Sequence, residues 1–188
     1  MIDQTLVFIT DRLNAHLSAV FSVPEPLVAI GPLSDAEGKP TAEARNRLTL
    51  FLTNIAQDTV PRGSQSRHAR SVGQAPPVHL DIYVMLASGH DPEIYGEGLK
   101  LISAALMFFQ STPVMTPRTA PDMPAGLSQL SVEIANLKVE EIGQLWGNLG
   151  GRYVPSVMFK VRSVMIDAGD VTAITPLVRA PSSTAEAS

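Results

Sequence analysis

The sequence predicts a single α+β domain in which helices pack on one face of a mostly antiparallel sheet. Three segments repeat apolar residues every three or four positions, which is typical of amphipathic helices. Other segments alternate apolar and polar residues with the period of two that half-buried strands require. Few helices separate these strands, and this order favours an α+β architecture. We expect the domain to span residues 1–175 and to be followed by an extended tail, 176–188.

The N-terminal segment is the first expected helix, which Pro24 and Pro26 end. Its apolar face consists of Ile2, Leu6, Ile9, Leu13 and Leu17. The opposite side carries Asp3, Asp11, Arg12 and Asn14. This division predicts a helix that packs one face on the rest of the fold.

The expected strands are short and are bounded by turn-forming residues. They comprise residues 27–31, 47–56, 78–87, 129–135 and 155–167. Residues 171–175 could add a last short strand. Two segments rich in proline and polar residues, 32–44 and 111–126, are expected to be loops.

A second helix is expected from Asp91 to Gln110, because an Asp-Pro pair suits the start of a helix. Its main apolar stripe is Tyr95, Leu99, Ile102, Leu106 and Phe109. The rest of its surface is largely covered by Leu101, Ala105 and Phe108. We therefore expect this helix to be deeply buried. A third helix begins near Val139, ends at Gly150-Gly151, and places Leu145 and the lone Trp146 in the core. Contact of Trp146 with a partner is the alternative, because Trp is enriched at binding hot spots.

Two segments without periodicity are candidates for contact with a partner. Residues 58–77 form a long loop of the kind that is usually functional or flexible, and its basic residues are Arg62, Arg67 and Arg70. The functional interpretation is docking onto an acidic protein surface; the alternative is a solvated loop. The small polar tail, 176–188, is not expected to pack alone, and its candidate contact residues are Leu177, Val178 and Arg179.

Composition narrows the possible functions. The net charge of −4 and the pI near 5.5 argue against nucleic-acid binding. Charged residues make up 17% of the chain, which favours apolar surface hidden against a partner. A well-buried monomer with neutral loops is the alternative. No segment has the length of a membrane span, and the N-terminus lacks the basic region of a signal peptide. The sequence also contains no cysteine, which fits a reducing compartment. We therefore expect assembly in the cytoplasm.

The sequence contains only weak candidates for a catalytic or metal-binding site. His79 and Asp81 share one face of a strand, a spacing that metal sites use, but no third ligand is evident. Neither a phosphate loop nor a G-x-S-x-G elbow is present. Glu140 and Glu141 are adjacent and so point in different directions, which suits a helix N-terminus better than an acid–base pair. We expect no enzyme, no cofactor and no metal.

The chain resembles the cap, or tail-terminator, family of extracellular contractile injection systems, which are phage-tail-like particles. The resemblance covers about residues 2–175, and the segment 130–166 matches best. The matching features in that segment are Glu140-Glu141, Leu145-Trp146, Gly150-Gly151, Arg152-Tyr153 and the strand from Ser156 to Ile166. Each short motif is weak alone, and their order and spacing carry the resemblance. Family members commonly have Ser or Thr just before the acidic pair's helix; this chain has Lys138 there, so Asn136 is the expected cap.

The resemblance implies a tail-terminator-like fold and a non-enzymatic protein that ends the inner tube and the contractile sheath. It also implies a homo-oligomer, expected to be a hexameric ring, with sheath and inner-tube proteins as partners. If the tail extends at about 3.3 Å per residue, it spans on the order of 40 Å and could add a strand to a neighbouring subunit. The alternatives are an oligomeric scaffold or adaptor unrelated to injection particles and, behind it, a small hydrolase.

Overall fold

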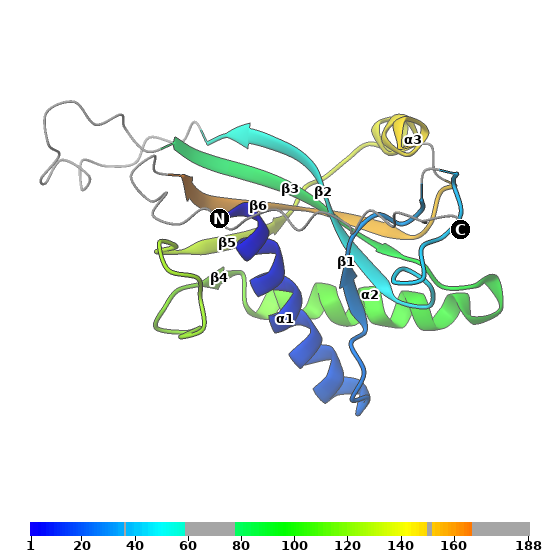
Figure 1. Cartoon of the computed structure of the whole chain (residues 1–188), viewed down its shortest axis with the longest axis horizontal. Helices are drawn as coiled ribbons and strands as arrows, with labels where there is room; N and C mark the ends of the chain where they lie inside the picture. The colour runs from blue at the N-terminus through cyan, green and yellow to red at the C-terminus, as the bar shows by residue number, and fades with distance from the viewer. Residues whose placement is uncertain (36, 59–77, 150–151, 167–188) are drawn as a thin grey trace, which may run out of the picture.

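Six strands form one mixed sheet, to which three α-helices are added (Figure 1). The computed structural model describes residues 1–35, 37–58, 78–149 and 152–166. The strands are β1 (Val28–Ile30), β2 (Leu48–Gln57), β3 (Val78–Ser88), β4 (Val114–Met115), β5 (Leu130–Ile134) and β6 (Ser156–Ile166). Their spatial order is β1-β2-β3-β6-β5-β4; β1 runs parallel to β2, and the other pairs are antiparallel. The expected α+β class is confirmed.

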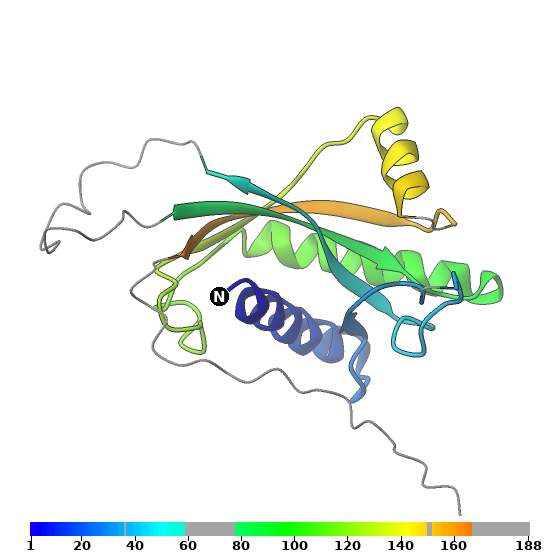
Figure 2. The same cartoon turned by 45° about the horizontal axis from the view of Figure 1, so that its top comes forward.

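The helices lie on both faces of the sheet, so the expectation that they share one face is wrong (Figure 2). α1 (Ile2–Phe21) and α2 (Tyr95–Ser111) cover what we call the inner face. α3 (Val139–Asn148) covers part of the opposite, outer face. β3 favours this arrangement, because Val84 and Leu86 point to the inner face while Met85 and Ala87, which alternate with them, are also apolar and point outward.

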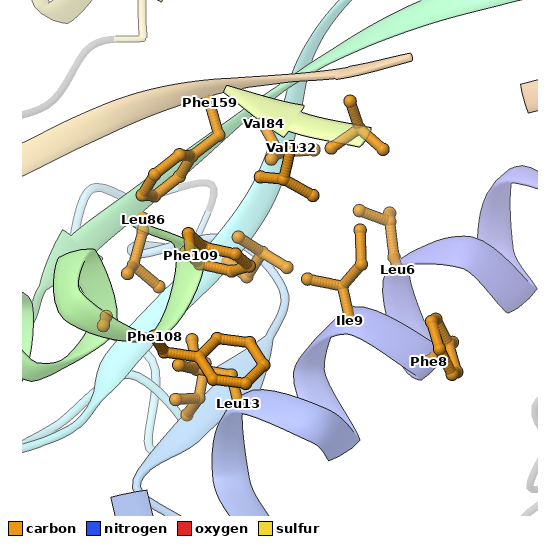
Figure 3. Packing of buried hydrophobic residues seen from close by; sticks show 14 of the residues in the cluster. Leu6, Phe8, Ile9, Leu13, Val84, Leu86, Phe108, Phe109, Val132 and Phe159 are labelled. Carbon is orange, nitrogen blue, oxygen red and sulfur yellow. The ribbon is translucent and has the colours of Figure 1, made fainter. Parts of the chain in front are cut away.

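The main core lies between the inner face, α1 and α2 (Figure 3). Phe109 of α2 packs on Phe159 of β6 with ring centroids 4.6 Å apart, and Phe108 packs edge-on against Phe109. Ile9 and Leu13 of α1 fill the space beside them. The apolar face expected for the N-terminal helix is therefore the one that it buries, apart from the half-buried Ile2.

Asn14 has a role that its place on the polar side of α1 did not suggest. Its Oδ1 accepts the backbone N–H groups of Leu27 and Val28, each at 2.9 Å, and its Nδ2 donates to the Val28 carbonyl at 2.9 Å. The side chain thereby pairs with the outer edge of β1 much as another strand would. This contact ties α1 to the first strand of the sheet.

α2 is rotated relative to the expected stripe. Its buried residues are Gly98, Leu101, Ile102, Ala104, Ala105, Phe108 and Phe109. Tyr95 and Leu99 are instead 50% and 41% exposed, so their assignment to the core is wrong. The cause is Gly98, where a Cβ would collide with the Ser88 hydroxyl oxygen, because the helix approaches the end of β3 closely at this point. Such an approach turns the small residues of α2 toward the sheet.

The remaining elements differ little from expectation. The segment 111–126, expected to be a loop, contains the two-residue strand β4, and a 3-10 turn, η1 (Pro92–Ile94), precedes α2. Lys138 rather than Asn136 precedes the first turn of α3, and its N–H donates to Glu141 Oε2 at 2.8 Å. Among the residues described, no helix is long and apolar enough to cross a bilayer.

The close approach at Gly98 predicts opposite effects for two substitutions in one helix. Gly98→Ala should lower the free energy of unfolding by about 1–3 kcal/mol, because the added methyl group overpacks the contact with Ser88. Gly96→Ala, whose Cβ would meet open space, should raise it by about 0.5 kcal/mol through helix propensity. Urea denaturation of both variants measures the difference; equal effects would contradict this account of the rotation of α2.

Candidate assembly surfaces

The two segments that the sequence marks for partner contact leave the described fold at the same end of the sheet. Residues 59–77 join the end of β2 to the start of β3. The segment 167–188 follows Ile166, the last residue of β6, which pairs with Val78 at the start of β3. We call this end, residues 52–57 together with 78–80, the open end of the sheet. Arg62, Arg67, Arg70, Leu177, Val178 and Arg179 themselves lie outside the described residues.

The open end also presents an unpaired strand edge. β1 pairs with β2 only from Leu48 to Leu50. In the part of the chain that the structure describes, no strand pairs with the outer edge of β2 beyond this point. Leu52, Ile55 and Val78 are exposed there. A strand edge that no described strand covers, beside exposed apolar side chains, is the type of edge to which a partner strand can add. One of its N–H groups, that of Ile55, already donates to Asn54 Oδ1 at 2.9 Å.

A second exposed apolar surface runs along α2. Tyr95, Leu99 and Met107 are each at least 41% exposed, and Leu106 is half-buried beside them. Their spacing places them on or near one flank, which we call the α2 flank. Grouped apolar residues on a helix surface, unlike scattered ones, indicate protein contact.

The outer face beyond α3 carries a network of charges. Asp81 is 4% exposed, and its carboxylate lies 2.8 Å from Lys160 Nζ and 3.7 Å from Arg162 Nε. A terminal nitrogen of Arg162 reaches Glu133 at 3.3 Å. The hydrogen bond to Asp81 raises the pKa of Lys160, whose ammonium also lies 5.6 Å from the ring centre of Tyr83. Opposite charges therefore join β3, β6 and β5 near the point where a register shift interrupts the pairing of β3 with β6.

This charge network gives Asp81 a role other than the metal binding considered for His79 and Asp81. Asp81 is engaged by two cations, and within the described residues no group of three His, Cys, Asp or Glu side chains converges. His79 lies on the same strand, where its carbonyl accepts the N–H of Asp58 at 2.9 Å. The Asp81 side chain thus has a structural use in charge balance, and the backbone of His79 takes part in pairing β3 with the end of β2.

A serine–histidine contact occurs at the opposite end of β3. The Ser88 hydroxyl lies 2.9 Å from His90 Nδ1, and burial lowers the pKa of His90 while Glu97 and Asp91 act in the opposite direction. A nucleophile must reach a substrate, but Ser88 is only 3% exposed and lies beneath Gly98. This contact suits the junction between β3 and α2 better than catalysis.

The residues expected in the core occupy two separate clusters. Phe109 is buried in the main core, and Leu106 lies half-buried at its margin. Trp146 is 4% exposed and belongs to the second cluster, which also contains Met85, Ala87 and Met158. Leu145 is half-buried against this second cluster. The indole ring of Trp146 packs edge-on against Tyr153, with ring centroids 5.9 Å apart.

The charge network predicts a clear contrast between its buried and exposed acids. Asp81→Asn should lower the free energy of unfolding by roughly 1–3 kcal/mol, because it leaves Lys160 and Arg162 without their buried counter-charge. Glu133→Gln, at the exposed end, should change it by less than about 0.5 kcal/mol. Thermal and chemical denaturation measure both; a Glu133 variant as unstable as the Asp81 variant would refute this ranking.

Comparison with solved structures found several that resemble this chain. One is the sheath/tube terminator of the extracellular contractile injection system PVC, in the extended state. The two chains are 19% identical, the match covers 91% of this chain and 63% of that chain, and the TM-score is 0.43. Another is the tube-terminating cap of the anti-feeding prophage, with 18% identity, coverage of 92% and 61%, and a TM-score of 0.50. The chain therefore spans less than two thirds of the length of either structure.

A search of curated proteins gave no match. The family described as the Pvc16 N-terminal domain matches residues 4–180, which is nearly the whole chain. The match includes every described strand and helix apart from Ile2 and Asp3 at the start of α1. The chain belongs to the Pvc16 N-terminal domain family.

Proposed function

We propose that this protein is a structural cap, or tail terminator, that ends the inner tube and contractile sheath of a phage-tail-like contractile injection system. The observation that carries the proposal is the family match over residues 4–180. The likeness in fold to a tube-terminating cap supports it. We further propose that the cap is a ring of about six copies, because a head-to-tail interface that closes on itself forms a ring.

The proposed action is steric and involves no catalysis. A terminator must occupy the last binding surface of a polymer and offer no equivalent surface to the next subunit. Two described surfaces fit separate parts of this task. We assign the α2 flank to contact between copies, since interfaces within permanent oligomers are the more apolar class. We assign the open end of the sheet, with residues 59–77 and 167–188, to contact with sheath and tube.

An oligomeric scaffold or adaptor unrelated to injection particles remains the alternative. It would share the apolar surfaces of the α2 flank and the open end, and it would have no affinity for tube or sheath ends. A small hydrolase lacks support from the described residues, because Asp81 is engaged by cations and Ser88 is buried.

The cap proposal predicts where the protein binds. Labelled protein mixed with assembled tubes and sheaths should be found by electron microscopy at one end of each particle, as rings of about six copies. Leu99→Ser should weaken ring formation at least about tenfold, because it removes exposed apolar area from the α2 flank. Val7→Ser, which removes similarly exposed apolar area from α1 outside this flank, is the matched control and should leave the ring intact.

Binding elsewhere than at particle ends would count against the cap, whereas the Leu99 variant tests only the assignment of the α2 flank. If the protein binds along the sides of the particles, or if it oligomerises normally but does not bind particles at all, the adaptor is favoured. A Leu99 variant that caps tubes as well as the unchanged protein would remove the α2 flank from the interface while leaving the cap itself supported.

The tail makes a further prediction that separates its role from that of the ring. Deleting residues 176–188 should leave ring formation unchanged and weaken attachment to the sheath, because the tail is proposed to reach a neighbouring subunit. Co-sedimentation of the truncated protein with sheath measures attachment. Replacing 176–188 by a Gly/Ser segment of equal length controls for tail length, and unchanged attachment of both variants would exclude this role.

A further inference from the structure

α3 is held to the sheet by few contacts. Trp146 is its one buried residue in the described structure, whereas Ile142 and Leu145 are half-buried and Val139 is 81% exposed. By contrast, α1 and α2 each bury a full face against the main core. α3 contains 10 residues, and isolated helices of that length are marginal in water, so its order depends on its docking.

The contacts that α3 makes are separated from the main core by the sheet itself. The second cluster lies on the outer face, whereas the main cluster lies on the inner face with α1 and α2 (Figure 2). Met85 and Ala87 are held by strand pairing with β2 and β6, whether or not α3 covers them. Loss of α3 therefore leaves the backbone ladder and the main core in place.

The anchor is also imperfect. The indole N–H of Trp146 is buried and has no hydrogen-bond partner among the described residues. A buried donor without a partner destabilises the closed position, because water would satisfy it in the open one. A single anchor that loses a hydrogen bond on docking favours a helix that can release.

We propose that α3 is a hinged cover that opens independently of the rest of the domain. Opening exposes Met85, Ala87 and Met158, an apolar patch on the outer face that is hidden in the closed state. The fold of β2, β3 and β6 with α1 and α2 persists in both states. This proposal does not rest on the function as a cap.

Hydrogen exchange of the full chain, followed by mass spectrometry, tests the cover. Amides of α3 should exchange at least about 100-fold faster than those of β3 and β6, and low urea should accelerate them little, because local opening exposes little surface. Trp146→Ala should bring α3 close to the exchange rate of an unfolded peptide while β3 and β6 stay protected. The emission of Trp146, the lone tryptophan, reports the same opening in the unchanged protein through acrylamide quenching.

Ile9→Val, a mild change in the main core, is the matched control. It should accelerate exchange in β3 and β6 several-fold and leave α3 unchanged, because it weakens the main core equally in the open and closed states. Equal exchange rates for α3 and β3 in the unchanged protein, with both accelerated alike by Ile9→Val, would show one cooperative unit and overturn the proposal.

Discussion

The central strand β3 carries apolar residues on both of its faces, and the rest of the structure depends on this constraint. Its inner residues, such as Val84 and Leu86, require the cover that α1 and α2 supply. Its outer residues, Met85 and Ala87, pack in a second cluster to which α3 contributes Trp146. β3 also pairs along nearly its whole length with β2 and β6, so these three strands form a frame to which the other elements attach. The apolar clusters, the helix positions and the free edges follow from that frame.

The edge strands of the sheet are much shorter than its central strands. β1 has three residues and β4 has two, so neither covers its long neighbour. Asn14 satisfies backbone groups next to β1, and the Pro113 carbonyl accepts the N–H of Val132 beside β4. Short edges blocked in this way discourage non-specific strand addition. Beyond Leu50 the outer edge of β2 pairs with no strand among the described residues. A bulge between Leu52 and Asn54, and the hydrogen bond from the Ile55 N–H to Asn54 Oδ1, protect it in part.

Local patterns predicted the elements well and their orientation less well. The apolar face of α1, the positions of the long strands and the burial of Trp146 depend on short-range periodicity. The rotation of α2 depends on how closely Gly98 approaches β3, which is a tertiary fact. The alternation of β3 identified two faces but treated the outer one as polar, because one-sided burial is the common case in antiparallel sheets. The contacts of Asn14 and Asp81 join segments far apart in the sequence, so no local signal could have found them.

For the candidate assembly surfaces too, the sequence identified the segments but not how they are placed in space. The sequence located the arginine-containing loop and the tail, but the pairing of Val78 with Ile166 is what brings their points of departure together. The low content of charged residues left a hidden interface and a well-buried monomer as alternatives. Exposed apolar residues grouped on the α2 flank and at the open end favour the interface. A terminator needs such asymmetry, because a subunit that offered complementary surfaces at both ends would extend the polymer that it should stop. A sheet with one open end and short, blocked edges would give the proposed terminator that asymmetry.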